Sequence, residues 1–282
     1  MIRAGMVCAL ALVVCLTTGA CGSSGPEASP GARPTTTTAA SDGAPPSVRV
    51  VLGGDSVMAS LVPAVRAALG DQAQVDYLAA PTISTASDRA AWEAGIEEHD
   101  PDLVVVLVGP WEVLQPGFAP TETGWPATYA DEVLDPLVAS LTAGGARVLW
   151  VEMHSSTKVA TTLSFAVLGA QARALAEREE AVDVIDAGAF VDHPDGTLAD
   201  VLRAADGAPE RIRRLDGTGV HLCPAGVVRL ATPVLDWLTD HADEPVSLVP
   251  GWEGAAWRWP PELEHPEQCP PASDPARSTG AP

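Results

Sequence analysis

Five short apolar segments, separated by stretches with a helical pattern, place the strongest constraint on how this 282-residue chain can fold. Most of these segments are near-continuous in Val, Leu and Ile, which is typical of strands buried on both faces of a parallel sheet. They are residues 48–52, 75–78, 103–108, 148–151 and 182–185. The helical stretches are residues 63–69, 86–99, 129–142, 161–176 and 225–241. This alternation predicts an α/β fold, a three-layer α/β/α sandwich with a five-stranded parallel sheet.

Two residues refine this prediction. Arg49 interrupts the first apolar segment, but at the entry to a strand its charged head can reach water. Pro63 opens the first helical stretch, and proline fits the first turn of a helix better than its interior. We therefore expect the first helix to begin near Pro63.

Residues 1–21 have the features of an export signal. Arg3 supplies the positive charge, and an apolar core and small residues before a cleavage point follow it. Residues 16–24 resemble a bacterial lipobox, which implies that Cys21 becomes a lipidated N-terminus; ordinary secretion is the alternative. Residues 22–46 read as a flexible Thr/Pro/Ala/Gly-rich tether, with almost nothing large and apolar to bury. We expect an exported protein, lipid-anchored on the outer face of the bacterial cytoplasmic membrane or secreted.

The charge of the chain excludes some partners. Its formal net charge is −21 and its pI is near 4.4, whereas nucleic-acid binding needs Lys and Arg to neutralise phosphates. Electrostatic docking on anionic lipid is disfavoured for the same reason. The only membrane contact that we expect is therefore through the lipid on Cys21.

Cys223 and Cys269 are the two cysteines that remain beyond the leader and its lipobox. A pair of cysteines in an exported protein most simply forms a disulfide. Neither belongs to a spaced Cys/His cluster, so we predict no metal site.

The α/β domain is expected to span residues 47–245. A Trp/Pro-rich arm, residues 246–272, follows it. Buried tryptophans usually pack, so we expect this arm to lie on the domain through its indoles. Exposed tryptophans that bind a partner or a glycan are the alternative. Residues 273–282 read as a disordered tail.

Ser56 is the first candidate for chemistry. It follows Gly53-Gly54 and Asp55 at the end of the first predicted strand and precedes an apolar, helical segment. Open α/β sheets place their chemistry at this edge, and the N–H groups of the following helix can stabilise an anion. A serine in this place can instead merely cap the helix.

His221 is the second candidate, near the far end of the chain. It lies in the glycine-rich stretch 216–222, after a basic stretch, residues 211–214, that we read as helical. A loop histidine held in a fixed pose suits a general base, although a lone loop histidine is more often a surface residue. Ser, His and an acid together activate a hydroxyl for nucleophilic attack.

At these positions the chain resembles the SGNH, or GDSL-like, hydrolases. Gly54-Asp55-Ser56-Val57 resembles the opening signature of the family, and residues 217–226 resemble the closing one. Residues 101–109 are similar to the central strand that leads to the Gly-x-Asn segment of the family. Residues 108–112 and 221–224 resemble the extracytoplasmic domains of actinobacterial cell-surface acyltransferases. The likeness implies the SGNH-hydrolase fold, which is flavodoxin-like.

The resemblance also implies roles. Ser56 is the nucleophile and His221 the base, with the N–H of Ser56 and Gly109 contributing to the oxyanion site. The family places its Asp three residues before the His, where this chain has Thr218. Asp216, five residues before His221, can replace it if the loop bulges; otherwise a backbone carbonyl must orient the imidazole.

The oxyanion site departs most from the family pattern. Trp111 stands at the position of the family's Asn, and the sequence has no asparagine. Backbone N–H groups of residues 80–83 and the Trp111 indole are possible substitutes, because each is a donor. Asp55 and Glu112 are further candidates for the oxyanion or substrate site, with a solvated or salt-bridged loop acid as the alternative for Glu112. Two other polar residues could line the same cleft, Glu152 and His154.

The sequence therefore predicts an extracytoplasmic serine esterase or acyltransferase. The resemblance implies small acyl (acetyl-type) esters of a cell-envelope carbohydrate or lipid as its substrates, and no cofactor. The alternative is a catalytically weak or inactive domain that binds an envelope glycan or protein. An extracytoplasmic solute-binding protein is a weaker possibility, because the chain lacks a second lobe to close around a ligand.

Overall fold

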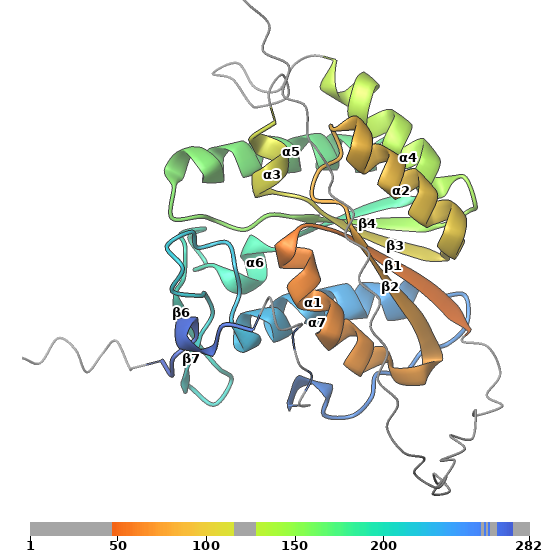
Figure 1. Ribbon diagram of the computed structural model, residues 1–282. Coiled ribbons are helices and arrows are strands. Elements are labelled where there is room, and N and C mark those ends of the chain that lie inside the picture. Colours follow the sequence, from red (N-terminus) through yellow and green to blue (C-terminus); the bar gives the residue numbers. More distant parts are fainter. Residues whose placement is uncertain (1–46, 116–127, 255–256, 258, 260–263, 273–282) are drawn as a thin grey trace, which may run out of the picture. The chain divides into compact units, whose positions relative to one another are not determined.

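Five parallel strands form the central sheet in the order β2-β1-β3-β4-β5 (Figure 1). The strands are β1 (Val48–Gly54), β2 (Ala73–Ala79), β3 (Leu103–Leu107), β4 (Arg147–Glu152) and β5 (Val182–Asp186). This computed structural model describes residues 47–115, 128–254, 257, 259 and 264–272. The expected leader, the tether, Cys21 and residues 273–282 lie outside the described residues.

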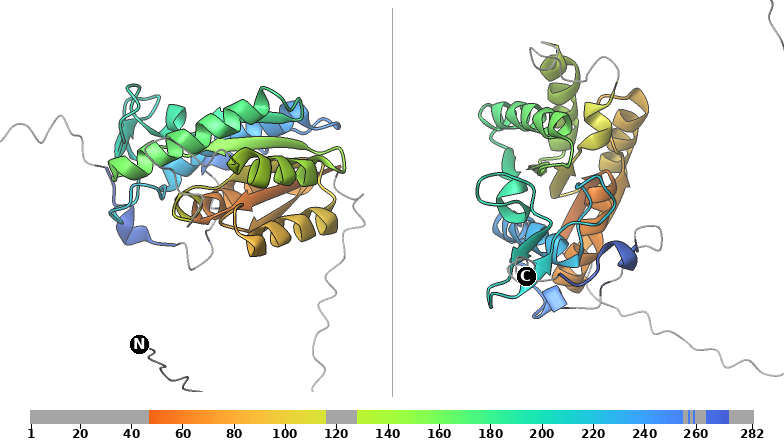
Figure 2. Two further views of the ribbon diagram at one scale, coloured as in Figure 1. Left: turned by 90° about the horizontal axis from the view of Figure 1, so that it is seen from above. Right: turned by 90° about the vertical axis from the view of Figure 1, so that its left-hand side faces the viewer.

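Helices cover both faces of the sheet (Figures 1 and 2). On one face lie α1 (Ser56–Leu69) and α7 (Pro224–His241), which pack against each other. On the other lie α2 (Ala86–His99), α4 (Asp135–Thr142) and α5 (Val159–Ala176). The three-layer α/β/α sandwich predicted from the alternating pattern is therefore confirmed.

Shorter elements complete the described chain. They are η1 (Gly70–Gln72), α3 (Pro110–Val113), the π-helical η2 (Ala130–Leu134), α6 (Gly188–Val191), β6 (Val201–Arg203), β7 (Pro209–Arg211), η3 (Trp252–Gly254) and η5 (Pro266–Gln268). Among the described residues, α5 alone is long and apolar enough to cross a membrane by length and composition. Its Phe165, Leu168 and Leu175 are buried against the domain, whereas most residues of the helix are not buried.

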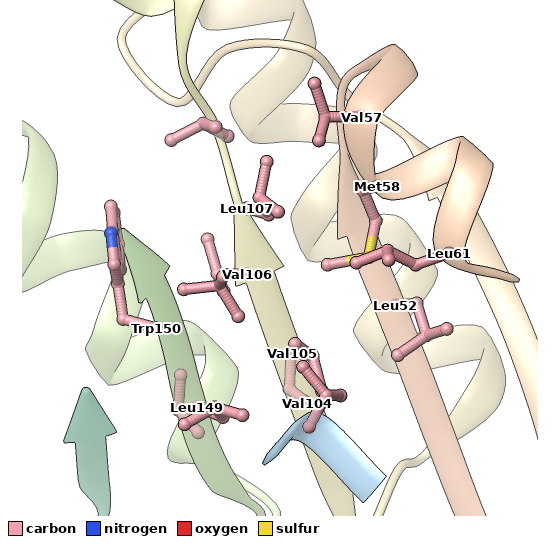
Figure 3. Packing of buried hydrophobic residues seen from close by; sticks show 14 of the residues in the cluster. Leu52, Val57, Met58, Leu61, Val104, Val105, Val106, Leu107, Leu149 and Trp150 are labelled. Atoms are coloured by element: carbon pink, nitrogen blue, oxygen red, sulfur yellow. The ribbon is translucent and has the colours of Figure 1, made fainter. Parts of the chain in front are cut away.

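Side chains from both faces of the central strands make the core, and Figure 3 shows part of it. Val57, Met58 and Leu61 of α1 are fully buried, as are all five residues of β3. Burying one such side chain contributes roughly 1.5–3 kcal/mol. Arg49 stays at the entry of β1, as expected, and pairs with Asp100 and Asp102 at 2.6 and 2.9 Å.

Two local predictions were wrong. The first helix begins at Ser56, so Pro63 lies inside it. It starts there because the Asp55 side chain accepts a hydrogen bond from the Val57 N–H at 2.8 Å and caps the helix. Residues 211–214 are not helical either: β6 and β7 form an antiparallel pair, and Arg213 makes a β-bridge with Leu222.

The register of the sheet brings the carboxyl ends of the strands to one edge. Gly54 is paired with Ala79 of β2 and Leu107 of β3, and Glu152 of β4 with Asp186 of β5. The helices that follow β1 and β2 lie on opposite faces of the sheet (Figure 1). The point where β1 and β3 adjoin is therefore the topological switch point, where open sheets bind ligands.

Candidate active site

Two glycines let the strand and the helix approach closely at Ser56. A Cβ on Gly53 would lie 1.9 Å from the Trp92 ring, and one on Gly54 would lie 1.8 Å from the Leu107 carbonyl oxygen. Gly54 has a φ of 149°, which side chains rarely adopt. Both glycines belong to β1 rather than to a turn. Because these two residues have no side chain, the end of β1 can pack directly against Trp92 and Leu107. This close packing sets the position of Ser56 at the start of α1.

The structure brings together the three residues that the sequence singled out. Ser56 Oγ lies 2.9 Å from His221 Nε2, and His221 Nδ1 lies 2.5 Å from Asp216 Oδ2. Gly217 and Gly219 have positive φ values of 77° and 71°. These turns fold the loop back on itself, so that an acid five residues before His221 reaches its ring. The departure from the family spacing is therefore compatible with a Ser-His-Asp arrangement.

Asp216 is held as a carboxylate. Burial by itself would raise its pKa, but hydrogen bonds from the Thr218 N–H and hydroxyl and from the His221 ring bring the pKa below its usual value. The Thr218 contacts are 2.8 and 2.7 Å long and both reach Oδ1. This leaves Oδ2 to accept the Nδ1 proton of His221, which fixes the orientation of the imidazole.

Ser56 and His221 open into a pocket of about 310 Å³. Its other lining residues are Pro110, Trp111, Leu114, Ser156, Lys158, Thr161, Thr218 and Val220. Trp111 and Leu114, both at α3, are 57% and 68% exposed, which is unusual for large apolar side chains. The sequence analysis did not single out Lys158, although it is the only lysine in the chain.

Glu112 is not a solvated loop acid, and it does not face this pocket. It is fully buried. Its Oε2 accepts hydrogen bonds from the N–H groups of Ile83 at 2.8 Å and Ser84 at 3.3 Å, and its Oε1 accepts one from the Tyr129 hydroxyl at 2.7 Å. The side chain therefore ties together segments that are distant in sequence, and the expectation that it contacts substrate is corrected.

Other structural hydrogen bonds, together with those of Glu112, occupy the backbone N–H groups of residues 80–83, which the sequence offered as substitutes for an Asn side chain. The N–H of Ala80 bonds to the Leu78 carbonyl at 2.9 Å. The N–H of Thr82 bonds to Asp88 at 3.0 Å, and that of Ile83 is taken by Glu112. Residues 80–83 are thus occupied by structural hydrogen bonds.

The two backbone donors that the sequence analysis expected at the oxyanion site stay available. Within the described part of the chain, no acceptor is bound to the N–H of Ser56 or of Gly109. Gly109 packs tightly on Met153, since a Cβ there would lie 2.6 Å from its side chain. The indole of Trp111, at the rim of the pocket, is a third potential donor.

Asp55 is buried beneath the nucleophile rather than turned toward a substrate. Its Oδ1 caps α1, and its Oδ2 is buried without a hydrogen-bond partner. Burial raises its pKa to about 7, against the lowering effect of the N–H groups of Val57 and Met58. The expected contact between Asp55 and substrate is thus not supported by its position.

Glu152 and His154 line a separate cavity of about 540 Å³. Glu152 pairs with Arg173, and His154 contacts Arg213, which forms an ion pair with Asp192. Burial, followed by the charge of Arg213, holds the pKa of His154 well below its usual value. His154 is therefore a neutral packing residue. In the described residues no cluster of His, Cys, Asp and Glu suited to a metal ion is found.

The C-terminal arm is attached beside the His221 loop. Cys223 and Cys269 form the expected disulfide. The Trp259 indole donates a hydrogen bond of 2.9 Å to the carbonyl of Ser60 in α1, and the Arg214 guanidinium lies 4.5 Å from its ring centroid. These contacts join the helix that carries Ser56 to the segment that carries His221.

A family model described as "Protein of unknown function (DUF459)" matches residues 49–237 of the chain. A search of curated proteins finds no match. Among solved structures, the catalytic domain of peptidoglycan O-acetyltransferase A from Streptococcus pneumoniae is 20% identical, with a TM-score of 0.45, over 71% of this chain and 98% of that chain. A putative platelet activating factor from the same organism is 13% identical, with a TM-score of 0.47, over 71% and 86%. A catalytic mutant of an acetylxylan esterase from Geobacillus stearothermophilus is 15% identical, with a TM-score of 0.43, over 70% and 95%.

Proposed function

The chain belongs to the DUF459 family, and we propose that it is a serine-dependent enzyme that hydrolyses or transfers acyl groups held in ester linkage. One observation carries this proposal: an unbroken line of hydrogen bonds runs from Ser56 through His221 to Asp216. A serine that merely caps a helix has no need of an oriented imidazole at its hydroxyl.

The proposed reaction has two halves. The Ser56 oxygen attacks the ester carbonyl carbon while its proton passes to His221 Nε2, and the carbonyl electron pair moves to oxygen. The oxyanion collapses and the alcohol leaves, taking the proton from His221. Water, or the hydroxyl of an acceptor, then attacks the acyl-Ser56 ester and gives its proton to His221. Collapse breaks the bond between the acyl carbon and the Ser56 oxygen, His221 returns its proton to that oxygen, and the acid or the new ester leaves. Asp216 stabilises the imidazolium in both halves.

The oxyanion would be held by the N–H groups of Ser56 and Gly109. The first lies at the N-terminus of α1, where the helix dipole also favours negative charge. Loss of one oxyanion donor lowers kcat on the order of 10²–10³-fold in a well-studied protease. With no Asn side chain at this site, we expect a slower reaction unless the Trp111 indole donates.

The place of action that we propose is the cell envelope. The lipobox-like sequence at Cys21, residues 22–46 as a tether and the Cys223–Cys269 disulfide all fit an exported, lipid-anchored enzyme. The substrates would be acyl esters of an envelope carbohydrate or lipid, as the motif resemblance implies. The α/β domain would span residues 47–245, and the arm would span 246–272.

A second candidate function is binding without turnover. The observation that favours it is the Glu112 carboxylate, because it occupies the N–H groups of Ile83 and Ser84, which therefore cannot serve in place of the missing Asn side chain. In that case the pocket would hold an envelope glycan or protein and Ser56 would be chemically idle.

A fluorophosphonate probe separates the two functions. We expect the purified protein to be labelled, and the labelling to vanish in Ser56→Ala and to fall strongly in His221→Ala. Ser164→Ala is the matched control, because this helix serine bonds only to the Ala160 carbonyl and should leave labelling intact. A wild-type protein that is folded by circular dichroism and still unlabelled would refute the enzyme.

A further inference from the structure

The Ser56 pocket combines an apolar wall with one positive charge. Pro110, Trp111, Leu114 and Val220 supply the wall, and Lys158 supplies the charge. No carboxylate is among the described residues that line the pocket. The composition of the chain makes this positive charge unusual. Lys158 is the only lysine in a chain of formal net charge −21, and it lies in the pocket that holds the candidate nucleophile.

The contacts of the described residues do not give the Lys158 side chain a role in stabilising the fold. Among the described residues, no acid pairs with its ammonium group. It stands at the N-cap of α5, makes no side-chain capping bond, and no acidic residue occupies the first turn. A cation at this end of a helix is unfavourable, because the dipole there is positive. The residue is therefore poorly suited to stabilise the helix that it begins.

Most arginines of the described chain, by contrast, are engaged. Arg49, Arg147, Arg173 and Arg178 each pair with a carboxylate, and Arg213 does so in the interior. Among the described residues, an acidic protein thus has an unpaired positive charge at Lys158, in the pocket that Ser56 also lines. A negatively charged ligand is repelled by most of the surface and attracted here.

We propose that the pocket at Ser56 selects an anionic ester, and that Lys158 binds a carboxylate or phosphate which the substrate carries. This inference rests on the proposed ester chemistry at the same site. The apolar wall would pack against a short aliphatic stem between the scissile carbonyl and the anion. Lys158 is a specificity residue in this arrangement and takes no part in proton transfer.

The anion can come from either side of the ester. In the acyl arm, the acyl group is one half of a dicarboxylic acid, and its free carboxylate meets Lys158. In the alcohol arm, the acyl group is neutral and the alcohol carries a phosphate. In both cases an anionic group of the substrate meets the Lys158 ammonium group, and pairs of charged and neutral substrates distinguish the two cases.

The test compares kcat/KM within two pairs of esters. The acyl pair is the p-nitrophenyl half-ester of adipic acid and the same compound with its carboxylate methylated. The alcohol pair is 1-butyrylglycerol 3-phosphate and 1-butyrylglycerol. We expect the anionic member of one pair to be preferred on the order of tenfold, which corresponds to about 1.4 kcal/mol. The preference should shrink as salt is raised, because exposed charges are screened.

Three variants assign the preference to Lys158. Lys158→Gln should abolish it and Lys158→Arg should retain most of it. Arg147→Gln is the matched control: it removes the same charge at the amino end of β4, away from the edge that carries Ser56, and should retain it. Equal rates within both pairs for the wild type, or a preference that survives Lys158→Gln, would overturn the inference and leave the ester chemistry standing.

A binding measurement decides the inference even without turnover. By calorimetry, the anionic ester of the preferred pair should bind Ser56→Ala about tenfold more tightly than it binds Ser56→Ala/Lys158→Gln. If no ester is hydrolysed and the probe does not label the protein, the proposed function fails. In that case the affinities of both anionic esters for Ser56→Ala and for Ser56→Ala/Lys158→Gln are compared. A loss of about tenfold for one ester supports the role of Lys158, and no loss for either ester overturns it.

Discussion

Asp55 makes the stability of this protein depend on pH, and one substitution isolates the effect. Its carboxyl group is fully buried, one oxygen caps α1 and the other has no hydrogen-bond partner. Burial raises its pKa from 3.8 to about 7. The folded state therefore favours the protonated acid, whereas the unfolded chain ionises near its ordinary pKa.

The sign and size of the effect follow from these two values. Since the folded pKa is the higher one, the stability is fully present below about pH 4 and is lost as the pH rises to about 7. A shift of roughly three units corresponds to about 4 kcal/mol. That is a large part of the 5–15 kcal/mol by which native domains are typically stable. We therefore expect the contribution of Asp55 to stability to be smallest above pH 7.

Asp55→Asn removes the charge and keeps the cap, because Asn is as good an N-cap as Asp. Urea unfolding followed by tryptophan fluorescence should show the variant more stable than wild type by up to about 4 kcal/mol at pH 8, and equal to it at pH 4. Asp206→Asn is the control: its exposed side chain accepts an N–H bond of 2.9 Å from Ala208 in a turn, so the same chemical change is made outside the core. An Asp55→Asn effect of the same size at pH 4 and pH 8 would refute the reasoning.

Three further outcomes follow from the described contacts. Asp216→Asn should lower kcat toward p-nitrophenyl esters by about 10⁴-fold, as loss of the carboxylate that orients the imidazole does in serine proteases, while ester binding to the pocket changes little. Glu112→Ala should lower the free energy of unfolding by about 3–5 kcal/mol, because it leaves buried N–H groups unpaired; Glu112→Gln, which can still accept from them, should cost clearly less. Cys269→Ser opens a disulfide that spans 46 residues, so its loss should lower the free energy of unfolding by about 4 kcal/mol in the chain-entropy model. Denaturation midpoints measured with and without reductant check this last value, since wild type in reductant should match the variant.

The fold could be predicted because its signal is local and repeated. Each parallel strand is buried on both faces, so each appears in the sequence as a continuous apolar run, and β3 is buried at all five positions. The start of the first helix was predicted wrongly, because a capping hydrogen bond outweighs the preference of proline for the first turn of a helix. Pro63 suggested a helix start, but the hydrogen bond between Asp55 and Val57 begins the helix seven residues earlier.

The site was predictable in part. The motif order indicated Ser56 and His221, and the structure places them in hydrogen-bonding contact. Whether Asp216 reaches the ring depends on the positive φ values of Gly217 and Gly219, which glycine permits but does not require. The spacing alone therefore left two possibilities open.

The role of Glu112 could not be read from its neighbours in sequence. Acids are almost never fully buried unless they are paired, and the partners of this one, Ile83 and Tyr129, are 29 and 17 residues away. Only the folded chain brings these three residues together. The same long-range contact occupies the N–H of Ile83, one of the backbone donors that the sequence offered as possible substitutes in the oxyanion site.

The scarcity of oxyanion donors and the charge of Lys158 have a joint consequence for catalysis. Binding energy from a part of the substrate that does not react can be used to orient the reacting carbonyl, and a truncated substrate then loses kcat as well as affinity. If the N–H groups of Ser56 and Gly109 are the main donors to the oxyanion, as we propose, the reaction depends strongly on such orientation. If Lys158 anchors the anionic end, the neutral ester of the preferred pair should therefore show a lower kcat, and not only a higher KM. An effect confined to KM would mean that the anion is bound equally in the ground state and the transition state.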